Sequence, residues 1–140
     1  LGKNEKKHFH SGNEISYFLY KGYKFSTQIC LETHINDLSI LQRKSNTNII
    51  LAPFNTPYSV EKRMANWMKY IPTRGYDYNM CFVCCNNKGG KLCVNGKGQV
   101  KEEINLGQHE TFQIDKDDFN RRVDYMSYRK EELYKSLDNT

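Results

Sequence analysis

Apolar and polar side chains alternate along residues 24–29, which is the pattern of a β-strand with one buried face. Phe25, Thr27 and Ile29 lie on one face, and the opposite face is polar. Two short apolar runs follow, "NIILAP" (48–53) and "MCFVCC" (80–85), and such runs are typical of buried strands. We therefore expect one sheet with strands at 25–30, 48–51 and 80–84, the second of them stopped by Pro53.

Other segments show the apolar spacing of amphipathic helices. The stretch 34–45 places Ile35, Leu38 and Leu41 at helical spacing, and 59–71 forms a second helix whose apolar face ends with Ile71. Toward the C-terminus we expect a hairpin around Gly96 and Gly98, a strand over 109–115 and a partly helical segment over 117–137. Because strands and helices alternate early, the pattern predicts an α/β layered fold without an internal domain boundary.

Composition narrows the possible partners. The 140 residues carry a net charge of +5, but the lysines and arginines are dispersed among 16 acidic residues, so we expect no nucleic-acid partner. No apolar run approaches the roughly 20 residues that a membrane span needs, and we expect no membrane contact. The first ten residues are polar and basic and show no secretory signal. With an odd number of cysteines, five, this favours free thiols in the cytoplasm.

Four of the cysteines are close enough in sequence to suggest a zinc site. Their spacing is C-x2-C-C-x7-C, formed by Cys81, Cys84, Cys85 and Cys93. In a strand, however, Cys84 would point to the face opposite Cys81 and Cys85. Cysteine is also among the most buried residue types. We therefore expect buried core cysteines and no metal.

Cys30 stands apart because it ends the first predicted strand, where the chain turns toward a helix. A side chain at such a corner can project from the sheet, and the N–H groups of the turn can stabilise an anion, as in a nucleophile elbow. The position alone is also compatible with a buried structural thiol.

Three stretches resemble motifs of the carbon–nitrogen hydrolase (nitrilase) superfamily. "KKHFHSGNE" (6–14) is similar to its lysine motif, and "KFSTQICLE" (24–32) is similar to its cysteine motif. "RGYDYNMCFVCCNNKGG" (74–90) resembles the block R-A-x-E-N-x-x-Y-V-V-x-A-N-x-x-G, with Arg74, Asp77, Asn86 and Gly89 in register and Gly75 in place of the usual alanine.

The resemblance covers only the second half of the family's domain. It implies an α/β fold of the αββα-sandwich type, with residues 1–140 as the C-terminal portion of a single domain. It also implies a partner for the exposed half, either a complementing N-terminal half or a second copy in a homo-oligomer. The family's general-base glutamate belongs to the first half, so no residue of this chain is assigned to that role.

The same resemblance assigns candidate site residues. Cys30 would be the nucleophile, Lys6 would stabilise the anion, and Glu14 would orient Lys6. The substrate would contact the Leu31 N–H and the loop residues Phe54, Asn55 and Tyr58. The substrate would be a small amide, carbamoyl compound or nitrile, with no cofactor. Taken singly, Lys6 and Glu14 are also compatible with ordinary solvated side chains. A non-catalytic assembly module, or less favourably a small zinc- or nucleic-acid-binding domain, is the alternative function.

Overall fold

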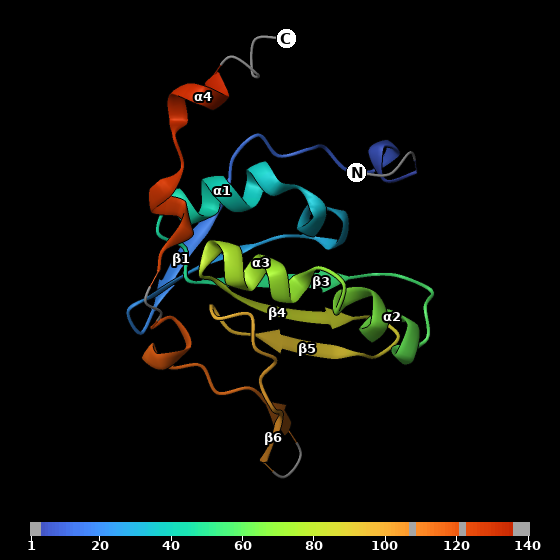
Figure 1. Ribbon diagram of the computed structural model, residues 1–140. Helices are drawn as coiled ribbons and strands as arrows, with labels where there is room; N and C mark the ends of the chain where they lie inside the picture. The colour runs from blue at the N-terminus through green and yellow to red at the C-terminus, as the bar shows by residue number, and fades with distance from the viewer. Residues whose placement is uncertain (1–3, 107–108, 121–122, 136–140) are drawn as a thin grey trace.

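The computed structural model describes residues 4–106, 109–120 and 123–135 and is built around one mixed β-sheet (Figure 1). Its strand order is β1-β2-β3-β4-β5, in which β2, β3 and β4 are parallel and the two edge strands are antiparallel to their neighbours. The strands are β1 (Tyr17–Tyr20), β2 (Tyr23–Thr27), β3 (Ile49–Phe54), β4 (Cys81–Asn86) and β5 (Lys91–Val94). A separate two-stranded sheet joins β6 (Ile104–Leu106) to β7 (His109–Thr111).

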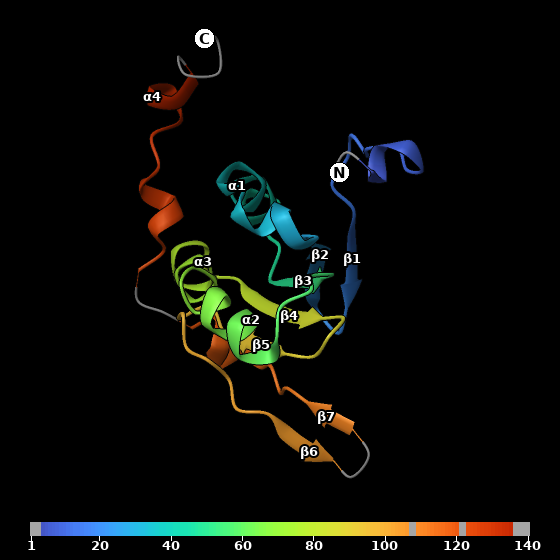
Figure 2. The ribbon, with the colours of Figure 1, turned by 90° about the vertical axis from the view of Figure 1, so that its right-hand side faces the viewer.

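Three helices cover one face of the main sheet (Figure 2). They are α1 (Asn36–Lys44), α2 (Val60–Trp67) and α3 (Ile71–Tyr78). Trp67 and Ile71 are fully buried against Ile50, Phe82 and Leu92 of the strands, and this cluster is the hydrophobic core. The short elements are η1 (Glu5–Lys7), η2 (Cys30–His34), η3 (Lys116–Asp118), η4 (Tyr125–Tyr128) and α4 (Glu131–Lys135).

The three predicted strands are confirmed, with different ends. The first strand stops at Thr27, and β3 continues through Pro53 to Phe54. Proline is tolerated because Leu51 directs its carbonyl toward β2, where it accepts the N–H of Gln28. Pro53, two residues on, faces the same side, and the paired part of β2 ends at Thr27. No donor is therefore missed.

The helix predicted over 34–45 is confirmed as α1, whereas the single helix predicted over 59–71 is wrong. The chain forms α2, breaks after Trp67 and starts again as α3, with Pro72 in its first turn. Proline is favoured there because its nitrogen needs no hydrogen-bond partner and its φ suits a helix. Ile71 is still buried, as the apolar pattern predicted, but from the second helix.

The C-terminal predictions are confirmed only in part. The turn at Gly96 and Gly98 forms, but the returning chain makes a single bridge, Val94 to Val100. The strand predicted over 109–115 is wrong beyond Thr111. The segment predicted as partly helical contains η3, η4 and α4, and its residues 121–122 and 136–137 lie outside the described residues.

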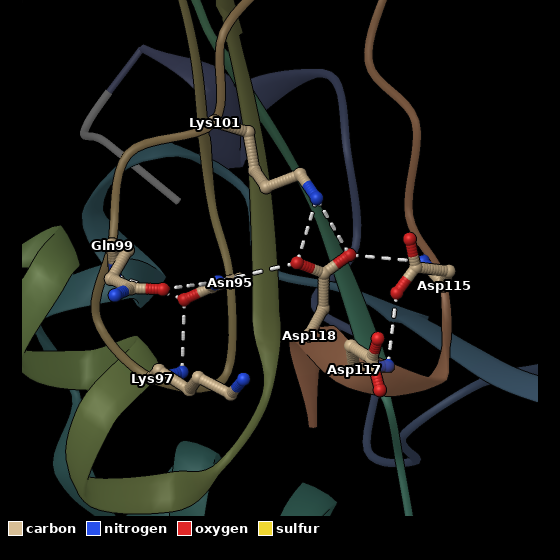
Figure 3. A network of polar contacts seen from close by, with 7 residues as sticks. All are labelled: Asn95, Lys97, Gln99, Lys101, Asp115, Asp117 and Asp118. Carbon is tan, nitrogen blue, oxygen red and sulfur yellow. Dashed lines mark hydrogen bonds and ion pairs between the residues drawn. The ribbon is translucent and has the colours of Figure 1, made fainter. Parts of the chain in front are cut away.

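A polar network fastens the turn after β5 to η3 (Figure 3). The Asp118 carboxylate accepts hydrogen bonds from Lys101 Nζ at 2.7 and 2.9 Å, from Asn95 Nδ2 at 3.2 Å and from the Asp115 N–H at 2.9 Å. Burial acts to raise the pKa of Asp118, but the hydrogen bonds from Lys101, Asp115 and Asn95 outweigh it and lower that pKa. The network thus closes one end of the sheet with a charged pair.

The face of the sheet opposite the helices is covered unevenly. Its residues include Phe18, Phe25, Leu51, Val83 and Cys85, as the strand register requires. Phe18 is 48% exposed and stacks on Phe25 at 4.8 Å, while Cys85 is also exposed. We call these five residues the open sheet face. In the part of the chain that the structure describes, no helix is long and apolar enough to cross a membrane.

Candidate active site

Cys30 lies at a sharp corner just beyond the end of β2. It is the first residue of η2 and is half-buried, and its φ is +49°. A positive φ is uncommon for a residue with a side chain, and such strain persists only where the surroundings hold it. The first N–H groups of a helix have no partner within the helix, so those of Cys30 and Leu31 can serve a ligand. The corner therefore has the form of a nucleophile elbow.

Side chains from η2, from α3 and from the turn before α3 hold this corner in place. Glu32 accepts the Ile29 N–H at 2.7 Å, and Thr33, which is fully buried, donates from Oγ1 to the Cys30 carbonyl at 2.7 Å. The Thr33 hydroxyl also pairs with the Tyr70 hydroxyl at 3.1 Å. Arg74 of α3 donates to the Thr33 carbonyl at 3.5 Å. Glu32 thus stabilises the turn itself.

A cavity of about 460 Å³ opens beside Cys30, between η2, the loop after β3 and α2. Of the predicted contact residues, Leu31, Phe54 and Tyr58 line it, whereas Asn55 does not. Asn55 is exposed because successive residues of an extended chain alternate in direction, so Phe54 and Thr56 face the cavity. Asn55 therefore does not contribute to this cavity, and its contact with a substrate stays a prediction.

The loop after β3 is fixed by Asn86 at the end of β4. Its Oδ1 accepts the Thr56 N–H at 3.1 Å and the Thr56 hydroxyl at 2.9 Å. Asn86 is one of the residues in register with the family block, and the structure gives it a positioning role.

Sequence reasoning missed several residues of this cavity. They are Arg63, Asn66, Lys69 and Tyr70, from α2 and the turn after it. His34 of η2 also lines the cavity, as its place just after the cysteine turn suggests. The spacing of 63, 66 and 70 follows one helix face, and this was the available signal. Burial, followed by the charges of Arg74 and Arg63, lowers the pKa of His34.

A second cavity, about 440 Å³, lies on the other side of Cys30 and is lined by the N-terminal segment. Glu5, His10, Ser11 and Gly12 contribute to it. Lys6 and Glu14 are exposed and line neither cavity. The structure therefore brings their segment to Cys30 but not their side chains, and their roles stay predictions.

The other cysteines have different surroundings. Cys81, Cys84 and Cys93 are fully buried in β4 and β5, as expected, but Cys85 is exposed, and the expectation of burial there is wrong. Cys84 packs in the core beneath the helices, on the face opposite Cys81 and Cys93. Burial raises the pKa of Cys93 to about 12 and raises those of Cys81 and Cys84 further. Among the described residues, no group of three or more metal-ligating side chains lies together.

The mixed sheet with helices on one face has the fold of about half of an amidase from the nitrilase superfamily. An amidase mutant of that superfamily from Nesterenkonia AN1 matches with a TM-score of 0.74 and 16% identity, over 98% of this chain and 53% of the amidase. A glutamine-dependent NAD+ synthetase from Acinetobacter baumannii matches with a TM-score of 0.70 and 19% identity, over 85% of this chain and 25% of the synthetase.

A further structure of the Nesterenkonia amidase shows covalent addition of the acetamide moiety of fluoroacetamide at its active-site cysteine. It matches with a TM-score of 0.74 and 16% identity. The chain spans about half the length of these amidases, and the likeness establishes the fold. No protein-family model and no curated protein sequence matches this chain.

Proposed function

We propose that this chain carries the nucleophile of a hydrolase that cleaves a non-peptide C–N bond of a small molecule. The observation that supports this most strongly is Cys30, a half-buried thiol at a strained strand-to-helix corner that opens into a cavity. The fold shared with amidases that have an active-site cysteine supports the same reading. Amide, carbamoyl and nitrile substrates all suit this chemistry.

In the proposed reaction the Cys30 thiolate attacks the carbonyl carbon of the amide. The negative charge that develops on the oxygen is stabilised by the Leu31 N–H and by Lys6. The C–N bond then breaks, the amine or ammonia leaves with a proton, and a thioester remains on Cys30. Water hydrolyses the thioester to the carboxylic acid and restores the thiol. A general base outside this chain would take the thiol proton and activate the water, and Glu14 would orient Lys6.

We further propose that residues 1–140 are the C-terminal portion of one αββα sandwich. The open sheet face supports this, because exposed Phe18 and Cys85 lie where a second sheet would pack in a four-layer sandwich. The occupant is the complementing half of the same domain, or a second copy of this chain.

The test is amide hydrolysis by the full-length protein with a Cys30→Ala substitution. We expect a loss of more than about 1,000-fold in kcat, the scale seen when a nucleophile is removed from other hydrolases, with little change in thermal stability. Cys85→Ala, which removes an exposed thiol on the opposite sheet face, is the matched control and should retain activity. Full activity in Cys30→Ala, or no hydrolysis of any amide, carbamoyl compound or nitrile by the unaltered protein, would favour the assembly module instead.

A further inference from the structure

Arg63 is a buried cation in the cavity beside Cys30, and the described part of the chain offers its charge no acidic partner. The residue is only 5% exposed. Among the described residues, no carboxylate forms an ion pair or hydrogen bond with it. Buried charges are normally paired, because removing a charge from water costs several kcal/mol. This arginine therefore needs an explanation.

Aromatic rings supply part of the compensation. The guanidinium carbon lies 4.8 Å from the ring centre of Tyr58, 5.0 Å from that of Phe54 and 5.5 Å from that of Trp67. Nη2 donates to the Thr56 hydroxyl at 2.7 Å, and Nε is buried without an acceptor. The rings surround the guanidinium and restrict its movement but accept no hydrogen bond from Nε. The group is thus preorganised and incompletely satisfied.

The rest of the cavity wall has the same electrostatic character. Exposed Lys69 is a second cation in the lining, and none of the described aspartates and glutamates lines the cavity. His34 adds hydrogen-bonding capacity beside the thiol. A wall with two cations, no acid and a rigid guanidinium favours an anion, and guanidinium matches a carboxylate with two parallel hydrogen bonds.

We propose that Arg63 is a specificity residue that binds a carboxylate of the substrate, so that this site takes amides bearing an acid group in addition to the scissile bond. The inference rests on the proposed function, because it assigns the substrate class of the same site. If Arg63 were only a support for the loop after β3, the cavity would show no preference for anions.

The most direct test compares two alkylating reagents at Cys30 in the full-length protein. Iodoacetate is anionic and iodoacetamide is neutral, and their reactions with a thiol are otherwise alike. We expect the iodoacetate-to-iodoacetamide rate ratio at Cys30 to exceed that of glutathione by about tenfold, the scale of one hydrogen bond to a charged group. Arg63→Met should reduce the ratio to that of glutathione, and Arg63→Lys should retain part of it.

Lys62→Met is the matched control. Lys62 is the residue of α2 directly before Arg63 and also lies over the Tyr58 ring, at 4.5 Å, but does not line the cavity. The Lys62→Met substitution removes the same net charge as Arg63→Met, and the iodoacetate-to-iodoacetamide rate ratio should stay unchanged. Melting curves of each variant verify folding. The inference is overturned if the unaltered protein shows the same rate ratio as glutathione. It is also overturned if the ratio falls equally in Lys62→Met and Arg63→Met. No reaction of Cys30 with either reagent overturns this inference together with the proposed function.

Substrate preference provides a second readout. Succinamate and butyramide have the same chain length and differ by the carboxylate. We expect kcat/KM for succinamate to be about tenfold higher than that for butyramide. In Arg63→Met this difference should disappear because KM for succinamate rises. Equal hydrolysis of both amides would overturn the specificity while leaving the proposed hydrolase function intact.

Discussion

The corner at Cys30 and the paired strands around Cys84 each hold a cysteine, but by opposite means. Cys84 lies in regular β-structure, fully buried beneath α2 and α3, and its position is fixed by packing. Cys30 lies in a strained conformation held by polar contacts of Glu32, Thr33 and Arg74. Packing makes a thiol inert, whereas a polar corner beside a cavity leaves it available.

The difference shows how one sheet can carry both stability and chemistry. Residues in the middle of the strands exclude water and raise the pKa of the thiols, as in Cys93. At the strand ends, the chain must turn, its backbone donors lose their strand partners, and cavities form. Function in α/β folds is expected at such ends.

The packed region should tolerate no added atom. A methyl group at Gly75 of α3 would lie 2.6 Å from the Asn95 carbonyl oxygen, so Gly75→Ala should lower the free energy of unfolding by about 3 kcal/mol. Chemical denaturation measures this. Gly12→Ala is the control, because a methyl group there meets nothing within 4 Å. Equal stability of the two variants would contradict the close packing of α3 on β5.

Serine in place of the two cysteines should separate the regions directly. Cys84→Ser introduces a hydroxyl into an apolar, fully enclosed position, and we expect a loss of about 2 kcal/mol in unfolding free energy. Cys30→Ser, at the half-buried corner, should cost less than about 1 kcal/mol. A larger loss at Cys30 would reverse the comparison.

The polar support of the corner can be weakened without changing its shape. Thr33→Val removes the donor to the Cys30 carbonyl and the contact with the Tyr70 hydroxyl, and it should destabilise the protein by about 1.5 kcal/mol. Alkylation of Cys30 should change in rate as well. Thr73→Val, at an exposed position of α3, should leave both quantities unaltered.

The charged closure at the other end of the sheet predicts a pH dependence. The pKa of Asp118 is lowered by folding, so its contribution to stability is present above the ordinary value of 3.8 and is lost as the pH falls through the folded-state pKa. Asp118→Asn should flatten the decline of melting temperature below about pH 4. Asp117→Asn, in the same turn, should leave the decline intact.

The sequence predicted the regular parts of this molecule better than its irregular ones. Alternation and apolar runs located β2, β3 and β4, because burial imposes a repeating pattern. The break between α2 and α3 was missed, since the apolar positions continue across it to Ile71. The exposure of Cys85 was also missed, because it depends on what covers the open sheet face.

For the candidate site, the corner at Cys30 could be anticipated from its place at a strand end. Leu31, Phe54 and Tyr58 follow from neighbouring loops at the same edge of the sheet. Arg63 could not be anticipated, because its burial results from three rings that come together only in the folded chain. The positions of Lys6 and Glu14 depend on an N-terminal segment that pairs with no strand. Local sequence does not determine where such a segment lies.

The most direct test of the account is the order in which the five cysteines react with a dilute, neutral alkylating agent in the full-length protein. Cys30 is half-buried at the corner, whereas Cys85 lies on the open sheet face, which the complementing half or a second copy would cover in that protein. Peptide mapping over time should find label first on Cys30, then on Cys85, and last on Cys81, Cys84 and Cys93. Label on Cys85 before Cys30 would contradict both an activated thiol at the corner and a covered open sheet face.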